Sequence, residues 1–223
     1  IYWPIMLKAA GIPIYQGLNV HGFWNVKGSK MSKSIGNVTD PVQVTDEYGV
    51  DAFRYFLMRE MVFGLDANFT EETIITRINS DLANDLGNLF SRILSMTHRY
   101  FKGEVKAPDN DIETARDLCL KEPAKEAIAD FETAMARYEF HKGLAAVWQF
   151  IRRMNKYIDV NEPWTLAKNE ETIPVLETVL YNLMEGVRVV AGLLYPVMPR
   201  TAATMQKTLG IALPESGFFQ TEE

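Results

Sequence analysis

In the second part of the chain, from about residue 70 onward, apolar residues recur at intervals of three and four positions. Thr70 precedes the first such run and is followed by two acidic residues, a pattern typical of a capped helix start. The run consists of Ile74, Ile75, Ile78, Leu82, Leu86, Leu89, Ile93 and Met96. Because this spacing places apolar side chains on one helical face, it predicts one long helix from about Glu71 to Tyr100.

The same pattern predicts more helices further along the chain. They cover about 111–136, 140–161, a short stretch ending near Lys168, 171–195 and 199–209. In the helix after residue 140, the stripe of Leu144, Trp148, Ile151 and Ile158 is expected in the core, as are Met96, Met154 and Met184. These helices predict an antiparallel α-helical bundle over residues 67–223.

Residues 1–66 have a mixed pattern. We expect a short helix over 4–10, a strand over 16–21, a second extended piece over 22–27, and helices that begin at Pro41 and Val50. This order is typical of the end of an α/β nucleotide-binding domain. The chain is therefore predicted to be mainly α, with one domain over 1–66 and another over 67–223.

Composition and charge refine this picture. With 47% hydrophobic and 23% charged residues, the chain has the composition of a folded protein. Residues 1–39 contain four lysines and no acidic residue, so they carry +4, while the remaining residues together carry −10, giving the net charge of −6. The net charge argues against a general nucleic-acid coat, whereas the local positive charge would attract a nucleotide or a polyanion.

Cysteine usage and hydropathy indicate the cellular setting. The single Cys119 excludes an internal disulfide, and with only three histidines no structural zinc site is expected, so we predict that Cys119 is a small buried apolar residue. No apolar run reaches the ~18–20 residues of a membrane span, and no signal peptide is visible. A cytoplasmic location is expected. The chain starts at Ile1 without an initiator methionine, as the interior of a longer protein would.

The segment from Gly28 to Asn37 carries the most distinctive chemistry. Lys30 and Lys33 stand among serines between two glycines, which suits a mobile loop that contacts phosphate groups. Hydroxyl and backbone N–H groups could add donors. The segment lacks the Walker A pattern, and its alternative interpretation is a solvated Lys/Ser turn.

This loop and its surroundings resemble a known family. Lys30 to Ser34 has the sequence Lys-Met-Ser-Lys-Ser, preceded by His21-Gly22 and followed by Gly36-Asn37. It resembles the second signature of class I aminoacyl-tRNA synthetases. Within that class the chain is most similar to the methionyl-tRNA synthetases, through segments 3–7 (Trp-Pro-Ile-Met-Leu), 84–89 (Asn-Asp-Leu-Gly-Asn-Leu) and 162–164 (Glu-Pro-Trp). The resemblance covers most of the chain and weakens after about residue 200.

The resemblance implies a reaction. This family activates methionine with ATP, which gives methionyl-adenylate and pyrophosphate, and transfers methionine to tRNA(Met). The resemblance implies that Lys33 contacts the ATP phosphates, that Lys30 supports this contact, and that Ser32 and Ser34 hold the loop. Positioned lysines would stabilise the charge that develops on the phosphates and would need no covalent chemistry.

The resemblance also implies residues outside the loop. His21 and Gly22 match positions near the adenosine, with a structural strand end as the alternative. Asn88, Arg92 and Trp164 match positions that contact the CAU anticodon, and their chemistry suits single-stranded bases, which are bound by stacking and by amide or guanidinium donors. Asn88 and Arg92 share a helical face. For Trp164 the alternative is burial in the bundle core.

The family's first signature, a His-x-Gly-His motif that binds ATP, is absent from these residues. So are most of the nucleotide-binding fold, the zinc-knuckle insertion and much of the methionine pocket. We therefore expect these residues alone to be unable to form methionyl-adenylate, to hold no metal site, and to need the complete enzyme for Mg²⁺-dependent ATP binding. Two alternatives stay open at this point: a synthetase for leucine, isoleucine, valine or cysteine, and a non-catalytic tRNA-binding module. The oligomeric state is left undetermined.

Overall fold

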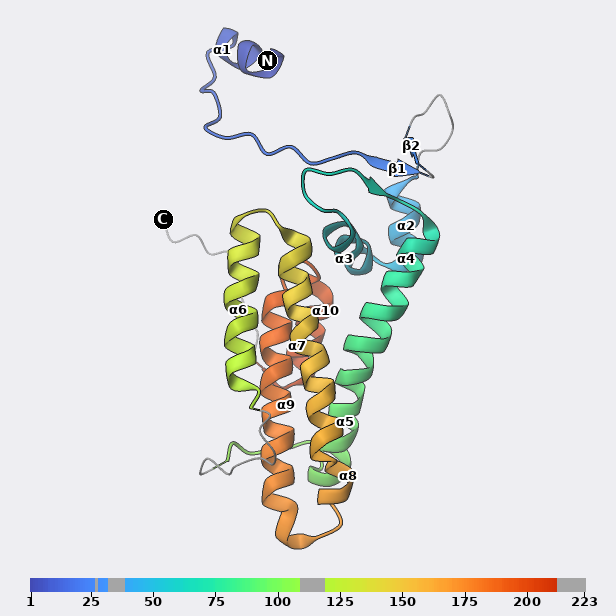
Figure 1. Ribbon diagram of the computed structural model, residues 1–223, viewed down its shortest axis with the longest axis vertical. Helices are drawn as coiled ribbons and strands as arrows, with labels where there is room; N and C mark the ends of the chain where they lie inside the picture. The colour runs from blue at the N-terminus through green and yellow to red at the C-terminus, as the bar shows by residue number, and fades with distance from the viewer. Residues whose placement is uncertain (27, 32–38, 109–118, 212–223) are drawn as a thin grey trace.

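A helical bundle forms most of the molecule, and a smaller part with three short strands lies at its upper end (Figure 1). The structure is a computed structural model and describes residues 1–26, 28–31, 39–108 and 119–211. The predicted fold class, mainly α with an antiparallel bundle, is confirmed.

The strands form a three-stranded sheet in the order β2-β1-β3. β1 (Trp24–Val26) pairs antiparallel with β2 (Ser29–Lys30) and parallel with β3 (Ala67–Asn68). The extended piece predicted for 22–27 is thus confirmed over 24–26, while residue 27 lies outside the described residues. The strand predicted for 16–21 is wrong, because both edges of β1 are already paired and the apolar residues of that segment are exposed. Helix α1 (Tyr2–Ala9) also has no buried residue among those described.

Three helices lie against this sheet: α2 (Pro41–Tyr48), α3 (Val50–Glu60) and α4 (Glu71–Arg77). As predicted, Asp40 caps α2, since its carboxylate accepts a hydrogen bond from the backbone N–H of Val42 at 2.9 Å. A hydrophobic cluster of Val44, Phe56, Phe69 and Ile74 joins the helices to the sheet, with Trp24 and Met31 packed on it. The Phe56 and Phe69 rings meet edge to face at 5.5 Å.

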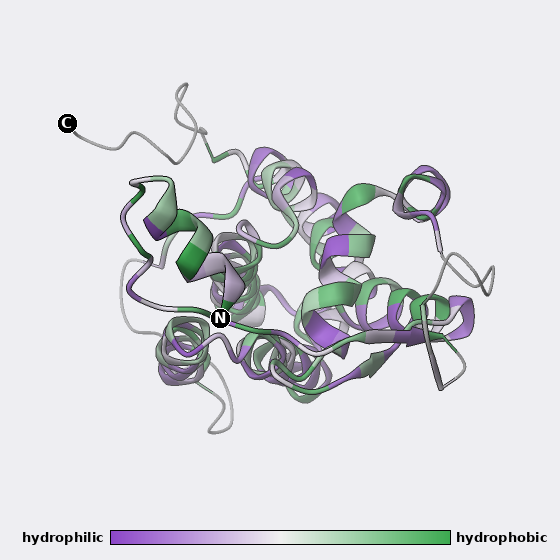
Figure 2. Ribbon diagram, turned by 90° about the horizontal axis from the view of Figure 1, so that it is seen from above, coloured by the Kyte–Doolittle hydropathy of each residue, from purple (hydrophilic) through white to green (hydrophobic). Residues whose placement is uncertain are grey.

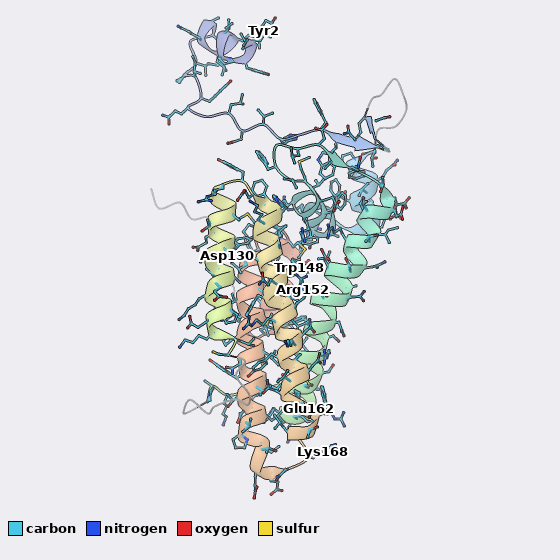
Figure 3. The ribbon with its side chains drawn as sticks, in the orientation of Figure 1. Tyr2, Asp130, Trp148, Arg152, Glu162 and Lys168 are labelled. Carbon is cyan, nitrogen blue, oxygen red and sulfur yellow. The ribbon has the colours of Figure 1, made fainter. Side chains whose placement is uncertain are left out.

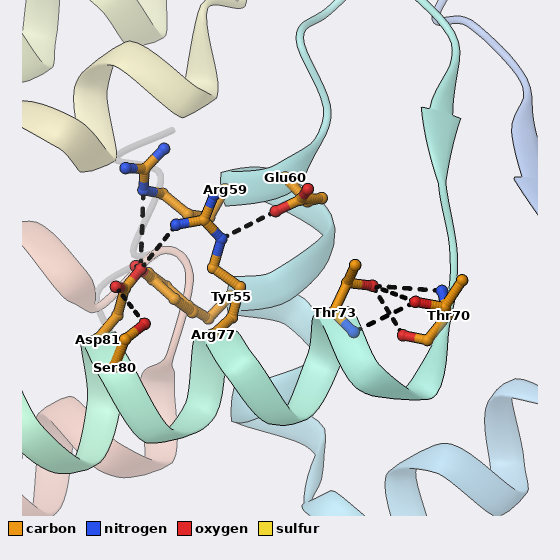
Figure 4. Close-up of polar contacts among 8 residues, drawn as sticks. All are labelled: Tyr55, Arg59, Glu60, Thr70, Thr73, Arg77, Ser80 and Asp81. Carbon is orange, nitrogen blue, oxygen red and sulfur yellow. Dashed lines mark hydrogen bonds and ion pairs between the residues drawn. The ribbon is translucent and has the colours of Figure 1, made fainter.

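The predicted long helix is continuous from α4 through η1 (Ile78–Gly87) to α5 (Asn88–Phe101). Its start is fixed by a capping box between Thr70 and Thr73 (Figure 4). Its middle segment, η1, is a π-helix, which the sequence pattern did not predict. Two side chains of a neighbouring helix donate hydrogen bonds to carbonyls of this segment: Trp148 Nε1 to Asp81 O at 3.3 Å and Asn155 Nδ2 to Asp85 O at 3.4 Å.

The remaining bundle helices are α6 (Lys121–Ala136), α7 (Phe140–Asn161), α8 (Pro163–Leu166), α9 (Ile173–Leu194) and α10 (Pro199–Thr208), with a short 3₁₀ helix η2 (Glu170–Thr172) before α9. The predicted breaks at the Glu-Pro-Trp segment and before residue 199 are confirmed. The predicted helix start near residue 111 lies outside the described residues, and α6 is described from Lys121.

The core lies where α5, α7 and α9 meet. Figure 2, seen from above, shows helices that carry both hydrophobic and hydrophilic stretches, as amphipathic helices do. The α7 stripe is buried as predicted, and Met154 lies within it, while Met96 and Met184 pack partly buried against it. Cys119 is exposed, which contradicts the predicted burial, since it precedes α6 instead of facing the core. No helix in the described part of the chain is long and apolar enough to span a bilayer.

Helix α3 ties the smaller part to the bundle. Tyr55 is fully buried in the bundle core, with its ring 4.6 Å from that of Trp148. Arg54 donates hydrogen bonds to the carbonyls of Pro196 and Val197, both at 2.8 Å. The domain boundary near residue 66 stays a prediction. The contacts of Tyr55 and Arg54 show that residues before this boundary pack directly on the bundle.

Candidate functional site

The Lys/Ser loop follows directly on β2. The backbone of Lys30 pairs with Asn25, and Met31 packs partly buried on the hydrophobic cluster that holds the sheet. Ser32, Lys33 and Ser34 lie outside the described residues, as does the side chain of Lys30. The structure therefore shows how the start of the loop is anchored, and the roles assigned to its lysines and serines stay predictions.

His21 and Gly22 lie where the chain crosses the segment before β3. A Cβ on Gly22 would lie 2.0 Å from the carbonyl oxygen of Leu65, so only glycine allows this close backbone approach. His21 is exposed, and its Nδ1 donates a hydrogen bond to Gly22 O at 2.7 Å. Beside them, Phe23 N donates to the Asp66 carboxylate at 2.7 Å. Gly22 thus has a structural role, and proximity of either residue to adenosine stays a prediction.

Asn88 and Arg92 both lie in the first half of α5. Asn88 is exposed, and the Arg92 guanidinium donates a hydrogen bond to Asp159 Oδ1 on α7 at 2.9 Å. Because the residues are one helical turn apart, their side chains leave the helix on one side, as predicted. Sequence reasoning missed Asp159, since it is distant in sequence from Arg92 and only the pairing of α5 with α7 brings the two together.

Trp164 lies at the break between α7 and α8. Glu162 has a left-handed backbone conformation (φ 43°) and Pro163 opens α8, so the chain turns sharply before the indole. Trp164 is 44% exposed, which contradicts the alternative of core burial. Figure 3 shows Glu162 and Lys168 at the lower end of the bundle, far from Tyr2. Because Asp159 is in the last turns of α7, Arg92 and Trp164 share this end of the molecule.

A buried ionic network connects the two parts of the structure (Figure 4). Asp81 in η1 accepts a hydrogen bond from the Tyr55 hydroxyl at 2.7 Å and from Ser80 Oγ at 2.9 Å. Arg77 and Arg59 lie 3.4 and 3.9 Å from the same carboxylate. Burial, and secondly the hydrogen bond to Asp81, raise the pKa of the Tyr55 phenol above its ordinary range. The sequence offered no signal for this network, because its residues lie in different helices and the pattern of apolar residues does not indicate which polar residues meet.

Within the described residues, no group of three or more His, Cys, Asp and Glu side chains is arranged to hold a metal ion. The candidate residues lie in two separate parts of the structure: the anchored start of the loop on one side, and Asn88, Arg92 and Trp164 toward the lower end of the bundle.

Comparison with known proteins agrees with this arrangement. The family described as tRNA synthetases class I (M) matches residues 1–94, and the anticodon-binding domain of tRNA ligase matches residues 122–219. Over 95% of its length, the chain is 46% identical to the methionine–tRNA ligase of Lactococcus lactis and 44% identical to that of Bacillus subtilis. The chain belongs to the methionyl-tRNA synthetase family. The alternative assignment to the leucine, isoleucine, valine or cysteine enzymes is therefore set aside.

Solved structures of this family superpose on the chain. Mycobacterium tuberculosis methionyl-tRNA synthetase in complex with methionyl-adenylate matches 95% of the chain with a TM-score of 0.86 and 40% identity, and the match covers 42% of that protein. The chain spans about a third of the length of the curated relatives it matches, 32% in both bacteria named above. The two family matches do not place a boundary at residue 66, because the first extends to residue 94.

Proposed function

We propose that this chain is part of a methionine–tRNA ligase, which activates methionine with ATP and attaches it to tRNA(Met), and that its bundle binds the CAU anticodon. The names of the relatives and the anticodon-binding match support this proposal, and so does the methionyl-adenylate bound to the M. tuberculosis protein. Mg²⁺ would accompany ATP in the complete enzyme, and the reaction would take place in the cytoplasm.

The observation that carries the proposal is the exposed surface at the lower end of the bundle. Trp164 presents a half-exposed indole at a helix break, and the Arg92 guanidinium is ion-paired with Asp159, in the last turn of α7 before that break. An indole can stack on an unpaired base, and the amide of Asn88 and the guanidinium can donate to base edges. The three side chains have the chemistry that an anticodon loop requires.

At the other end, the loop would contact ATP. Lys33 would bind the phosphates with support from Lys30, and Ser32 and Ser34 would hold the loop, with His21 near the adenosine. By analogy with other electrostatic donors, each lysine would lower the barrier by about 2–4 kcal/mol. The anchoring of Met31 on the hydrophobic cluster supports this role, because a loop fixed at its base can close over a ligand reproducibly.

A binding experiment tests the anticodon proposal without requiring catalysis. Fluorescence anisotropy would compare a labelled RNA hairpin with a CAU loop against hairpins in which each of the three bases is changed in turn. We expect each change to weaken binding by about 1–3 kcal/mol, the usual range for a hydrogen-bonded base contact. Equal affinity for all hairpins would exclude anticodon recognition.

A salt titration of the same complex separates base contacts from phosphate contacts. Phosphate contacts make the logarithm of the affinity fall linearly with the logarithm of the salt concentration, whereas base stacking is less affected. We expect a shallow slope together with clear discrimination between hairpins, because the chain carries a net charge of −6. A steep slope without discrimination would indicate non-specific attraction.

A further inference from the structure

A cavity of about 400 Å³ lies where the smaller part meets the bundle. Its walls come from the junction of α2 and α3, from η1 and the start of α5, and from α10. Most of its lining is apolar and includes Val50, Leu82, Leu86, Phe90, Met198 and Met205. It faces away from the proposed anticodon surface, because positions 82, 86 and 90 lie on the opposite side of the long helix from positions 88 and 92.

Asp51 places a carboxylate in this apolar wall. The residue is only 9% exposed, and its Oδ2 accepts a hydrogen bond from the backbone N–H of Thr201 at 2.6 Å, in the first turn of α10. Its Oδ1 is buried and has no hydrogen-bond partner within the described residues. A buried carboxylate oxygen without a donor is unfavourable, and a donor supplied by a ligand would remove that cost.

Arg200 adds the opposite charge to the lining of the same cavity. This residue also lines the cavity, is exposed, and forms no ion pair in the part of the chain that the structure describes. The hydrogen bond between Asp51 and Thr201 holds the first turn of α10 at the carboxylate, and Arg200 directly precedes Thr201 in that turn. One cavity thus presents a carboxylate that needs a donor, a guanidinium that can bind an anion, and an apolar wall.

We propose that this cavity binds a free α-amino acid with a large apolar side chain. The ammonium group would donate to the Asp51 carboxylate, and the ligand carboxylate would accept hydrogen bonds from the Arg200 guanidinium, which matches carboxylates in a bidentate manner. The side chain would pack among Leu82, Leu86 and Phe90. The size and the mainly apolar lining fit those of small-molecule sites. The proposal does not depend on the proposed function.

Occupancy would join the two parts of the molecule. The ligand would contact both α3 and α10, which are far apart in the sequence. A ligand that binds only the folded state raises the melting temperature as its concentration rises. We therefore expect the amino acid to stabilise the packing of α3 against the bundle.

Isothermal titration calorimetry with L-phenylalanine tests the proposal on the full 223-residue chain. Two matched compounds remove one charge each: phenethylamine lacks the carboxylate and 3-phenylpropanoate lacks the ammonium group. We expect a Kd on the order of 1 mM for L-phenylalanine, given its few non-hydrogen atoms, and binding weaker by at least about tenfold for each analogue. Equal binding of all three compounds, or no binding of L-phenylalanine at millimolar concentration, would overturn the proposal.

Variants locate the site. Arg200→Gln should weaken L-phenylalanine binding by about tenfold and leave phenethylamine binding unchanged, since only the first has a carboxylate for Arg200. Arg153→Gln, at an exposed arginine on α7, is the matched control and should bind as the unaltered chain does. If Arg200→Gln binds L-phenylalanine with unchanged affinity, the assignment is wrong.

Two further variants cover the interior of the cavity. Ala52→Leu adds volume at a lining position and should abolish binding of L-phenylalanine and of phenethylamine alike. Asp51→Asn should weaken binding of both amines, with circular dichroism to verify folding because Asp51 also caps α10. If Asp51→Asn does not fold, Ala52→Leu decides: retained binding in that variant would refute the cavity as the site.

Discussion

Trp148 and Trp164 show how the same side chain takes opposite positions in one bundle. Trp148 is 1% exposed and donates its indole N–H to the carbonyl of Asp81, so its single polar group is satisfied inside the core. Trp164 follows a proline at a helix break, where the backbone directs it outward, and it is 44% exposed. The local backbone, rather than the residue type, decides which indole is available to a ligand.

Replacing Trp164 with alanine should therefore affect binding and not folding. We expect Trp164→Ala to weaken the affinity for the CAU hairpin by about 1–3 kcal/mol, the usual loss when an aromatic side chain that stacks on a base is removed. Fluorescence anisotropy would measure the affinity, and thermal unfolding would measure stability.

Tyr138→Ala provides the matched control, because Tyr138 is an aromatic residue with the same 44% exposure, in the turn between α6 and α7. It should leave hairpin binding unchanged. A Trp164→Ala protein with unchanged affinity and a clearly lower melting temperature would show that the indole serves packing instead.

Because the pKa of Tyr55 is raised in the folded state, we expect the stability of the protein to depend on pH. Burial and the hydrogen bond to Asp81 raise the pKa of its phenol in the folded state above the value of about 10 that it has in the unfolded chain. The stabilisation is therefore complete below about pH 10 and is lost as the pH rises further, because the unfolded chain then releases a proton that the folded chain retains.

Tyr55→Phe removes this group and leaves the ring. We expect the variant to be less stable by about 1.5–3 kcal/mol at neutral pH, the range for a hydrogen bond to a charged group, and to lose less stability at alkaline pH than the unaltered chain. Urea unfolding at neutral pH and above about pH 10 would measure both effects. Parallel pH profiles for the two proteins would argue against this role of the phenol.

At the scale of elements, the crossing of Gly22 over the segment before β3 determines whether the small sheet forms. A Cβ at this position would lie 2.0 Å from Leu65 O and 2.2 Å from its carbonyl carbon, and both are backbone atoms that cannot move aside independently. The close approach lies two residues before Trp24, which pairs with Ala67 of β3, so we expect the pairing to depend on it.

Gly22→Ala should therefore destabilise the protein by about 1–3 kcal/mol, as overpacking typically does. Gly17→Ala is the control, since no atom lies within 4 Å of the Cβ that it would add; it should change stability by no more than about 0.5 kcal/mol. Chemical denaturation would compare the two variants. If Gly22→Ala and Gly17→Ala were equally stable, the two backbone segments could move apart at this crossing without loss of stability.

The elements that could be predicted from the sequence are those that local chemistry determines. The Asp40 cap with the following proline and the capping residue Thr70 both mark helix starts that the structure contains. The strand wrongly predicted over 16–21 and the unpredicted π-helix η1 are different cases. Whether a segment finds a strand partner, and which side chains hydrogen-bond to a helix, depends on residues far away in the sequence. Such residues leave no local pattern. The exposure of Trp164 followed from a helix break, whereas Asp159 beside Arg92 could be found only from the packing of α5 on α7.

At the scale of the whole molecule, α3 belongs to the bundle as much as to the smaller part. Tyr55 fills a fully buried position in the bundle core, and Asp81 in η1 is neutralised by Arg59 of α3 and by Arg77. A bundle without α3 would contain a cavity and a carboxylate with fewer partners.

We therefore expect a protein of residues 67–211 to be less stable than one of residues 40–211. Loss of a buried aromatic side chain alone costs about 3–5 kcal/mol, and loss of part of a buried ionic network adds to it. Thermal unfolding followed by circular dichroism would compare the two proteins. Equal melting temperatures would show that residues 67–211 form an independent folding unit.

The π-helical segment has a consequence for how the length of this protein can change during evolution. In η1 the hydrogen bonds span one residue more than in an α-helix, so one residue could be deleted there while the ladder tightens to the α-helical form. The helix on both sides would keep its direction, since the Thr70 cap fixes one end and the Arg92–Asp159 ion pair fixes the other. A deletion within α5 would instead rotate the following residues by about 100°. We therefore expect the long helix to tolerate loss of a residue in η1 better than loss of one in α5, with Asn88 and Arg92 still presented on the same side of the bundle.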